Sequence, residues 1–300
     1  MNRRFSSLVK EFLAWAAKCL RRSTVNVYRH YFKKWIAEQG DTQLSRIVPA
    51  RLTAWAKTWH ACQAIKRLFR WATVEACLIR RNPVADVKHP PKGYRRRIMS
   101  RKEIVTLLRD SKADLRRLLV CYRETFARPQ ELRIARWEDL ASDNPELTLR
   151  QSLEQGRAVL QLFEFKDGRR RRDTETPRII LLSPRACRLL LRMLGSLPTK
   201  KGSIFLTSKN KPWTGNALRC RFRRLRKRLR IVRDKRGETI VPYTFRHTGA
   251  TTAAAHGVRD RILADVLGHV ETKTTARYCH LQVSHLRSAM QTVWSRRRPL

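Results

Sequence analysis

Residues 244–281, TFRHTGATTAAAHGVRDRILADVLGHVETKTTARYCHL, contain the spacing on which our interpretation of this chain depends. Arg246 is followed by His269 after 23 positions and by Tyr278 after a further nine. The pattern predicts three short helical segments broken by glycines. An arginine binds phosphate oxygens through a planar, permanently charged fork, and a tyrosine hydroxyl can serve as a nucleophile. The stretch therefore indicates covalent phosphoryl chemistry.

The net charge of the chain indicates a polyanionic partner. Lys and Arg number 67 against 24 Asp and Glu, which gives a formal charge of +43 at pH 7. A chain with this imbalance repels itself unless a polyanion neutralises it, and nucleic acid is the first candidate. A general preference for arginine in the source's proteins would raise the count without serving any function.

The cysteines and the hydrophobic residues narrow the class of protein further. Seven cysteines are an odd number, are widely scattered and form no CxxC pair, so we expect reduced, mostly buried thiols rather than disulfides or a zinc knuckle. His256, Cys279, His280 and His285 lack ligand-like pairing, so we expect neither a metal nor a cofactor. With 42% hydrophobic residues in 300, the chain can bury one large core or two modest ones.

No segment reads as a membrane span or a signal peptide. The apolar patch near the N-terminus is interrupted by Lys10, Glu11 and Lys18, and no other run approaches the roughly 18 apolar residues that a span requires. We therefore expect a cytoplasmic, nucleoid-associated protein without membrane contact.

The first part of the chain predicts a small helical domain over residues 1–87. Apolar residues recur at helical spacing in four segments, with Gly40 as a stop for the second: 6–20, 24–38, 50–57 and 58–78. Basic residues are predicted on the solvent faces of these helices, where they would line a groove: Arg21, Arg22, Arg29, Lys33, Lys34, Lys66, Arg67 and Arg70.

A basic linker is predicted at residues 88–99, KHPPKGYRRRIM, after the helix-ending Asn82-Pro83. The second domain, 100–300, opens with a capping box in which Ser100 and Glu103 satisfy free backbone donors at a helix start.

The second domain reads as mostly helical with one β-hairpin. Two apolar, β-leaning runs, 158–166 and 177–182, flank an Asp-Gly turn and four arginines. Helices are predicted at 101–110, 114–127, 129–137, 184–194 and 215–232. The last of these helices has an apolar stripe that is expected to face inward: Leu218, Phe222, Leu225, Leu229 and Val232. Its basic face is expected to meet DNA. The fold class is mainly α, with a small antiparallel sheet (α+β).

Several motifs in order make this chain resemble the tyrosine recombinase, or phage integrase, family of Cre-like and Xer-like enzymes. They are Phe245-Arg246-His247-Thr248, Leu267-Gly268-His269, Thr274-Thr275 with Tyr278 and, more loosely, residues 127–132 (ARPQEL) and a hairpin lysine. The resemblance implies that residues 1–87 form a helical core-binding (SAM-like) DNA-binding domain. It also implies that 100–300 form the catalytic domain with a C-terminal tail.

The chemistry has three requirements when no metal is used: positive charge on the phosphate oxygens, a nucleophile, and an acid for the leaving oxygen. Arg128 and Arg246 suit the first. Tyr278 suits the second and, by resemblance, forms a covalent 3′-phosphotyrosine. Lys166 ends the first hairpin strand, where the family places its lysine acid, and arginine is a poor acid. His269 is implied to hydrogen-bond the scissile phosphate.

Two further residues are assigned by resemblance. Glu131, three positions after Arg128, is similar to the family's acid that orients the site, although a surface helix carboxylate would look the same. Tyr243 stands where the family usually has His or Lys, three residues before Arg246. Its hydroxyl can donate to a phosphate, but it is a weaker proton shuttle and a competing nucleophile. His247 reads as a packing or capping residue.

The function implied is a site-specific DNA recombinase for integration, excision or resolution, such as a mobile element uses. Its expected partners are double-stranded DNA inside a C-shaped clamp, further copies of the chain (a dimer per site and a tetrameric synapse) and accessory DNA-bending proteins. By resemblance, residues 281–294 would dock on a neighbouring subunit. Two alternatives stay open: a non-catalytic DNA-binding protein derived from an integrase, and strand relaxation like that of a type IB topoisomerase.

Overall fold

The computed structural model describes residues 3–91, 97–163, 177–195, 201–256, 258–268, 287, 290–291 and 293–295. By its contacts the chain divides into two compact units, residues 1–94 and 95–300. No helix in the described part is long and apolar enough to cross a membrane.

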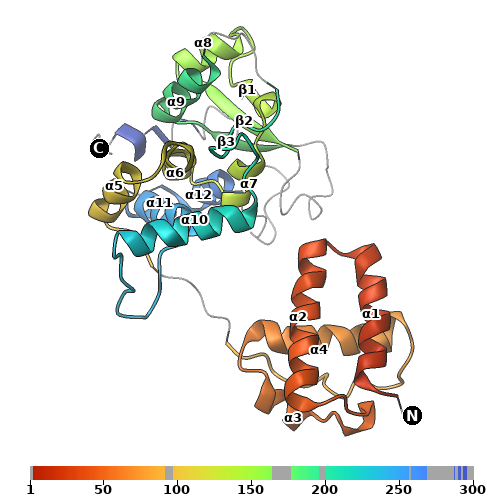
Figure 1. Ribbon diagram of the computed structural model, residues 1–300. Helices are drawn as coiled ribbons and strands as arrows, with labels where there is room; N and C mark the ends of the chain where they lie inside the picture. The colour runs from red at the N-terminus through yellow and green to blue at the C-terminus, as the bar shows by residue number, and fades with distance from the viewer. Residues whose placement is uncertain are drawn as a thin grey trace. The chain divides into compact units, whose positions relative to one another are not determined.

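The first unit is a bundle of short helices around an aromatic core. Helices α1 and α2 lie side by side and α4 crosses them (Figure 1). Phe12 contacts Phe32 edge-to-face, with ring centroids 5.6 Å apart, and Trp35 packs on Trp55 at 4.9 Å. The helices are α1 (Phe5–Cys19), α2 (Arg22–Gln39), α3 (Pro49–Trp55) and α4 (Trp59–Arg70), and α4 continues into a π-helical turn (Trp71–Glu75).

Two of the basic residues predicted on the solvent faces are used inside the first unit instead. Lys66 is half-buried, and its Nζ donates to the carbonyls of Ala85 (2.7 Å) and Val87. The guanidinium of Arg67 pairs with Glu75 at 2.8 Å and lies 4.9 Å from a ring centroid of Trp15. The prediction was wrong for these two residues because helix periodicity does not indicate which other segments of the chain pack against the helix.

The second unit contains most of the helices. The predicted capping box of Ser100 and Glu103 opens α5, and α9 has the predicted bounds. Helix α10 ends at Arg228, and Val232, predicted on its inward stripe, is 75% exposed. The helices are α5 (Arg101–Arg109), α6 (Ala113–Thr125), α7 (Pro129–Ile134), α8 (Leu149–Glu154), α9 (Pro184–Leu194), α10 (Gly215–Arg228), α11 (Tyr243–Ala255) and α12 (Asp260–Leu267).

A three-stranded antiparallel sheet, in the order β1-β2-β3, lies among these helices. Its strands are β1 (Leu140–Ser142), β2 (Ala158–Leu162) and β3 (Arg178–Leu181), and Leu160 pairs with both Leu140 and Ile180. The hairpin strands were predicted, whereas β1 and α8 were not. The mainly helical fold class with a small antiparallel sheet is confirmed.

The sheet is buried on both faces. Leu160 and Ile180 belong to the main core under α6 and α9, whereas Val159 and Leu181 belong to a second cluster with residues of α12. Successive side chains of a strand point to opposite faces, so burial of both explains the nearly continuous apolar runs in these strands. The second cluster positions α12 against β3, next to the candidate site.

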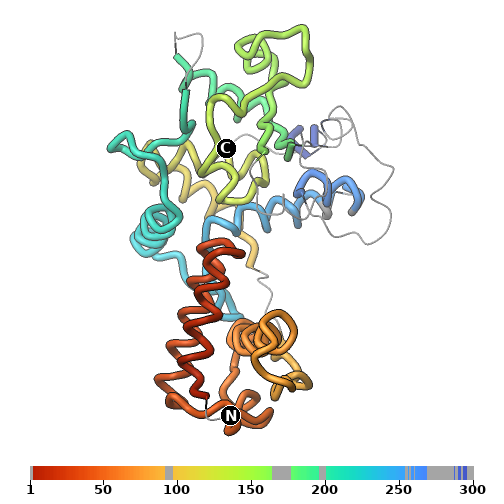
Figure 2. The backbone as a smooth tube through the Cα atoms, turned by 90° about the vertical axis from the view of Figure 1, so that its right-hand side faces the viewer, coloured from red at the N-terminus to blue at the C-terminus, as the bar shows by residue number. Residues whose placement is uncertain are grey.

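The described residues of the C-terminal segment pack on their own chain. Met290 and Val293 are 1% exposed and belong to the cluster that contains residues of α12. Figure 2 shows the backbone of this part of the second unit. Arg287 pairs with Asp143 and donates to the carbonyl of Gly156, and the indole of Trp294 donates to Glu124 O at 3.3 Å. These residues contact their own second unit, and the expected docking on a neighbouring subunit stays a prediction.

Candidate active site

Arg128 is held at the start of α7 by local geometry. Helix α6 ends at Phe126 in the left-handed conformation, with φ +55°, which turns the chain sharply. Pro129 then begins α7 with a fixed φ, and Arg128 precedes it in extended conformation. The guanidinium of Arg128 therefore lies at the junction of two helices, and its side chain is 12% exposed.

Glu131 binds Arg128 twice. One carboxylate oxygen accepts the backbone N–H of Arg128 at 2.7 Å, and the other accepts Nη1 at 2.8 Å. The Glu131 side chain is only 3% exposed, so its charge has to be matched by a partner. The alternative of a surface helix carboxylate is excluded, and the geometry is that of an acid that orients Arg128.

Arg246 lies in the first turns of α11 and is 2% exposed. Its Nη1 donates to the carbonyl of Phe126 at 3.0 Å, and its Nη2 donates to the carbonyl of Leu267 at 2.5 Å. One guanidinium thus connects the α6–α7 junction, α11 and the end of α12.

Arg128 and Arg246 converge on the C-terminus of α12. Nη2 of Arg128 donates to the carbonyl of Gly268 at 3.0 Å, and Arg246 donates to the preceding carbonyl, that of Leu267. The last carbonyls of a helix have no intrahelical partner and carry partial negative charge. Among the described residues, the carboxylate of Glu131 and these carbonyls lie against the two guanidinium groups. Two positive charges held close together suit a bound anion.

Burial lowers the pKa of Arg246, and the neighbouring charge of Arg128 lowers it further, whereas Tyr243 and Glu131 act in the opposite direction. Arginine starts so high that such a shift leaves the guanidinium charged at neutral pH. A second positive charge held close to the first is therefore maintained at an energetic cost that a bound phosphate would relieve.

Tyr243 is the first residue of α11, one turn before Arg246, and it lies close enough to raise the pKa of that arginine. It is 41% exposed. The structure therefore places it beside the arginine pair with part of its surface open to a ligand.

The remaining predicted residues, Lys166, His269 and Tyr278, lie outside the described residues. In the chain, Lys166 comes four positions after the end of β2, and His269 directly follows the glycine that ends α12. Half-buried His247 sits on α11 beside Arg246, on the helix that carries the site.

Three residues around the site were not identified from the sequence. Phe126 supplies the carbonyl for Arg246, and Gly249 passes its ring so closely that an added Cβ would lie 2.2 Å from a ring carbon. Arg178 reaches the same end of α12 from β3. A charged residue beginning an otherwise apolar strand was the one local signal for Arg178.

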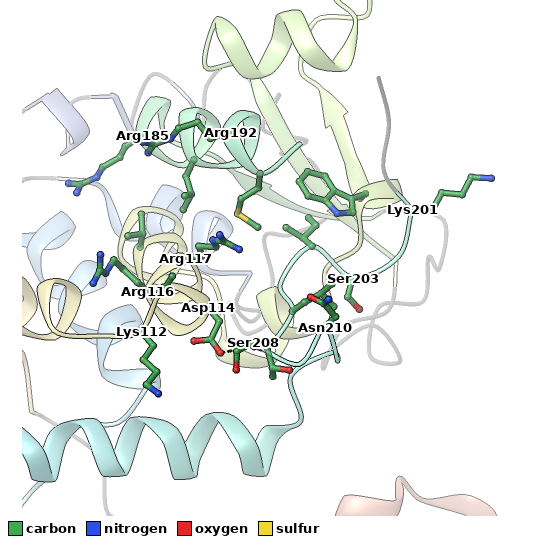
Figure 3. A pocket seen from close by; sticks show the side chains of 18 residues that line it. Lys112, Asp114, Arg116, Arg117, Arg185, Arg192, Lys201, Ser203, Ser208 and Asn210 are labelled. Atoms are coloured by element: carbon green, nitrogen blue, oxygen red, sulfur yellow. Dashed lines mark hydrogen bonds between the residues drawn. The ribbon is translucent and has the colours of Figure 1, made fainter. Parts of the chain in front are cut away.

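A cavity of about 1280 Å³ lies elsewhere on the second unit, between α6, α9 and residues 201–210 (Figure 3). Arg128, Glu131 and Arg246 are not among the residues that line it. Asp114 at its edge is already paired with Arg221 at 2.8 Å. Its basic residues are Lys112, Arg116, Arg117, Arg185, Arg192 and Lys201. The cavity is thus separate from the arginine pair.

Among the described residues, no group of three His, Cys, Asp or Glu could hold a metal ion.

The chain is similar to curated tyrosine recombinases over part of its length. Tyrosine recombinase XerC of Treponema denticola is 27% identical over 92 residues, which are 31% of this chain and 28% of the relative. Tyrosine recombinase XerD of Rickettsia bellii is 29% identical over 92 residues, 31% of this chain and 30% of the relative. The match spans less than a third of the length of either relative.

Two solved structures share the fold over most of the chain. One is a lambda integrase (75–356) dimer bound to a COC′ core site, with a TM-score of 0.65, 17% identity, and coverage of 90% of this chain and 96% of that one. The other is the Tn1549 transposon integrase in complex with transposon right end DNA, with a TM-score of 0.64, 17% identity, and coverage of 97% and 100%.

The family model described as "Phage integrase family" matches residues 97–285, which is more than half of the chain and includes Arg128, Glu131 and Arg246. The chain therefore belongs to the phage integrase family, the tyrosine recombinases.

Proposed function

We propose that this protein is a site-specific DNA recombinase that cleaves and rejoins strands through a covalent 3′-phosphotyrosine at Tyr278. The observation that carries the proposal is the convergence of Arg128 and Arg246, oriented by buried Glu131, on the end of the helix that precedes His269. Two charged forks fixed side by side match the non-bridging oxygens of a phosphodiester.

In the proposed reaction, the Tyr278 hydroxyl releases its proton to solvent as its oxygen attacks the phosphorus, and the bond from phosphorus to the 5′-oxygen breaks. Lys166 gives its proton to the departing 5′-oxygen, which leaves as a hydroxyl. Arg128, Arg246 and His269 stabilise the charge on the phosphoryl oxygens during the transfer. A 5′-hydroxyl from another strand then reverses the steps, so no bond energy is lost and no nucleotide cofactor is consumed.

Tyr243 is proposed to assist this transfer as a hydrogen-bond donor. It lies one helical turn before Arg246 and is partly exposed, which supports a contact to the same phosphate. A phenol, with a reference pKa of about 10, exchanges protons at neutral pH less readily than the His or Lys more usual at this position. We therefore assign it transition-state stabilisation, and the nucleophilic role to Tyr278.

The proposed DNA contacts involve both units. Residues 1–87 would act as the core-binding domain and 100–300 as the catalytic domain, joined by the basic linker 88–99 and closing around duplex DNA. Exposed arginines and lysines, such as those of α10, would contribute affinity through phosphate contacts. Dimers on each site, a tetrameric synapse and accessory DNA-bending proteins complete the proposal.

Nicked duplexes tiled across the DNA that flanks the chain's own gene test the proposal. A nick just downstream of the scissile bond releases a short 5′-hydroxyl fragment, so the covalent intermediate accumulates and survives denaturing electrophoresis. We expect adduct with the wild-type protein on one duplex, a slower yield with Tyr243→Phe, and none with Tyr278→Phe.

The nicked-duplex assay and a plasmid relaxation assay together separate the rival functions. Sequence-selective binding without adduct on any duplex would identify a non-catalytic DNA-binding protein and overturn the proposal. Relaxation of a supercoiled plasmid without exchange between two copies of the reactive site would instead indicate a topoisomerase-like activity.

A further inference from the structure

Arg178 is a buried arginine at the start of β3 that contacts the end of a distant helix. It is 3% exposed. Its Nη1 donates to the carbonyl of Asp265 at 3.0 Å, and its Nη2 donates to the carbonyl of Val266. Nη1 also donates to the carbonyl of Ile179, in its own strand, at 2.7 Å. Arg178 thus ties β3 to the last turn of α12.

Gly268 permits this close approach. It ends α12 in the left-handed conformation, with φ +64°. A Cβ added there would lie 2.5 Å from Nε of Arg178 and 2.8 Å from its Cζ. Both the backbone conformation and the packing of Arg178 therefore require glycine at this position.

Three arginines together bind four successive carbonyls, those of residues 265–268. Arg178 binds the first two, Arg246 the third and Arg128 the fourth. We call this set the arginine clamp. The Asp265 carbonyl also accepts the backbone N–H of Gly268 at 3.0 Å. For the later carbonyls the arginine clamp supplies the partners that a helix C-terminus lacks, and it opposes the partial negative charge of the helix end. His269 directly follows Gly268, the last residue bound by the arginine clamp, in the sequence.

Arg178 differs from the other two members in what it contacts. Its described hydrogen bonds go to carbonyls of β3 and α12, whereas Arg128 and Arg246 also contact the α6–α7 junction, where Glu131 lies. We therefore assign to Arg178 the support of the helix end. Arg128 and Arg246, by contrast, are the proposed phosphate ligands.

We propose that Arg178 is a positioning residue for strand cleavage, which fixes the end of α12 so that His269 and the two phosphate-binding arginines keep one geometry. This inference rests on the proposed recombinase function. A displacement of about 1 Å at a reacting group can lower a rate roughly 10²-fold, so a loosened helix end would slow the chemistry without removing the DNA contacts of the rest of the chain.

The test compares Arg178→Met and Arg178→Lys on the nicked duplex that yields adduct with the wild-type protein. For Arg178→Met we expect the adduct rate at saturating DNA to fall about 10- to 100-fold, with the Kd for that duplex unchanged within about threefold because the phosphate contacts remain. Arg178→Lys keeps the charge and should restore part of the rate.

Arg51→Met is the matched control. Arg51 is a half-buried arginine of the first unit that donates to the carbonyl of Gln39, the last residue of α2, at 2.6 Å. It therefore has the same kind of helix-end contact, in the unit that does not contain Arg128 and Arg246. Because the rates are compared at saturating DNA, a change in DNA affinity would not alter them, and the adduct rate of this variant should equal that of the wild-type protein.

A double-mutant cycle with His269→Ala separates positioning from general structural damage. If Arg178 acts in part through the segment that begins at His269, the loss of rate in the double variant should be smaller than the product of the two single losses. Multiplied losses would overturn the proposal. Unfolding of both Arg178→Met and Arg178→Lys would also overturn it, because Arg178 would then be needed for the fold itself.

Hydrogen exchange keeps this inference distinct from the recombinase proposal. We expect faster amide exchange in the peptide covering 260–268 in Arg178→Met, and unchanged exchange there in Arg51→Met. Absence of any adduct with the wild-type protein would contradict the recombinase function, whereas wild-type adduct with unchanged exchange and rate in Arg178→Met would contradict the role of Arg178 alone.

Discussion

Gly249 and Phe126 show how single residues set the position of the candidate site. Gly249 lies inside α11, where glycine disfavours a helix by about 1 kcal/mol relative to alanine. The ring of Phe126, which is fully buried, takes the space that a side chain at 249 would need. Because the Phe126 carbonyl accepts the hydrogen bond from Arg246, this contact also fixes the arginine.

Gly249→Ala should therefore be destabilising despite the better helix propensity of alanine. A Cβ 2.2 Å from the Phe126 ring has to displace it, and overpacking of this kind costs about 1–3 kcal/mol. We expect a lower urea midpoint together with a large loss of adduct rate.

Gly215→Ala is the control for this substitution. Gly215 begins α10 and has no atom within 4 Å of an added Cβ, so the variant should be as stable as the wild-type protein or slightly more stable. Equal stability of the two variants would show that α11 does not pass the Phe126 ring as described.

At the scale of elements, the segment after the last helix of the first unit is attached to α4. His89 stacks on Trp59 with ring centroids 5.3 Å apart, and its Nε2 lies 2.8 Å from the Gln63 side-chain oxygen. Lys66 holds the preceding residues through two carbonyls. The beginning of the predicted linker, 88–99, is thus packed rather than free.

This attachment predicts a pH dependence of stability. Burial lowers the pKa of His89, and the charge of Lys66 lowers it further. Below the unfolded-state pKa of about 6.5 the unfolded chain binds the proton more readily than the folded one, so the stabilisation is full above that pH and is lost as the pH falls towards the folded pKa.

We expect the wild-type protein to lose more stability between pH 8 and pH 5.5 than His89→Gln does, in urea unfolding followed by circular dichroism. An identical pH dependence in the two proteins would contradict the packed position of His89.

At the scale of the whole molecule, the accessibility of the cysteines tests how the main core is packed. Cys121 and Cys187 are buried in the main core, whereas Cys19 and Cys77 are exposed on the first unit. Burial raises the pKa of Cys187 to about 11, and thiolates are the reactive form. The expectation of mostly buried thiols therefore holds for only half of the cysteines that the structure describes, with Cys62 the third buried one.

Brief alkylation of the native protein with iodoacetamide at pH 8, followed by peptide mapping, should modify Cys19 and Cys77 and leave Cys121 and Cys187 unmodified until denaturant is added. Equal labelling of Cys187 and Cys77 in native buffer would mean that the core around β2 and α9 is not packed as described.

Local signals in the sequence predicted much of the fold. Ser183, Pro184 and Gly195 mark the ends of α9, which has the predicted bounds. A three-residue strand such as β1 has too short a pattern to detect. The end of α10 was missed because Arg230 adopts φ +51° without being glycine.

For three residues of the candidate site, the sequence indicated which residues act together but not their contacts. Arg128, Glu131 and Arg246 were identified from motif and spacing, and the structure brings all three together. The contact of Arg178 with α12 joins positions 87 residues apart. No local pattern encodes such a contact, because it depends on how the sheet and helix pack.

The most direct test of the account is the identity of the tyrosine joined to DNA. The trapped adduct would be digested with nuclease and trypsin, and the peptide carrying a nucleotide identified by mass spectrometry. Cleavage after arginine places Tyr278 in peptide 278–287 and Tyr243 in peptide 237–246. We predict the nucleotide on peptide 278–287. A nucleotide on peptide 237–246, or adduct that persists in Tyr278→Phe, would contradict the proposed mechanism.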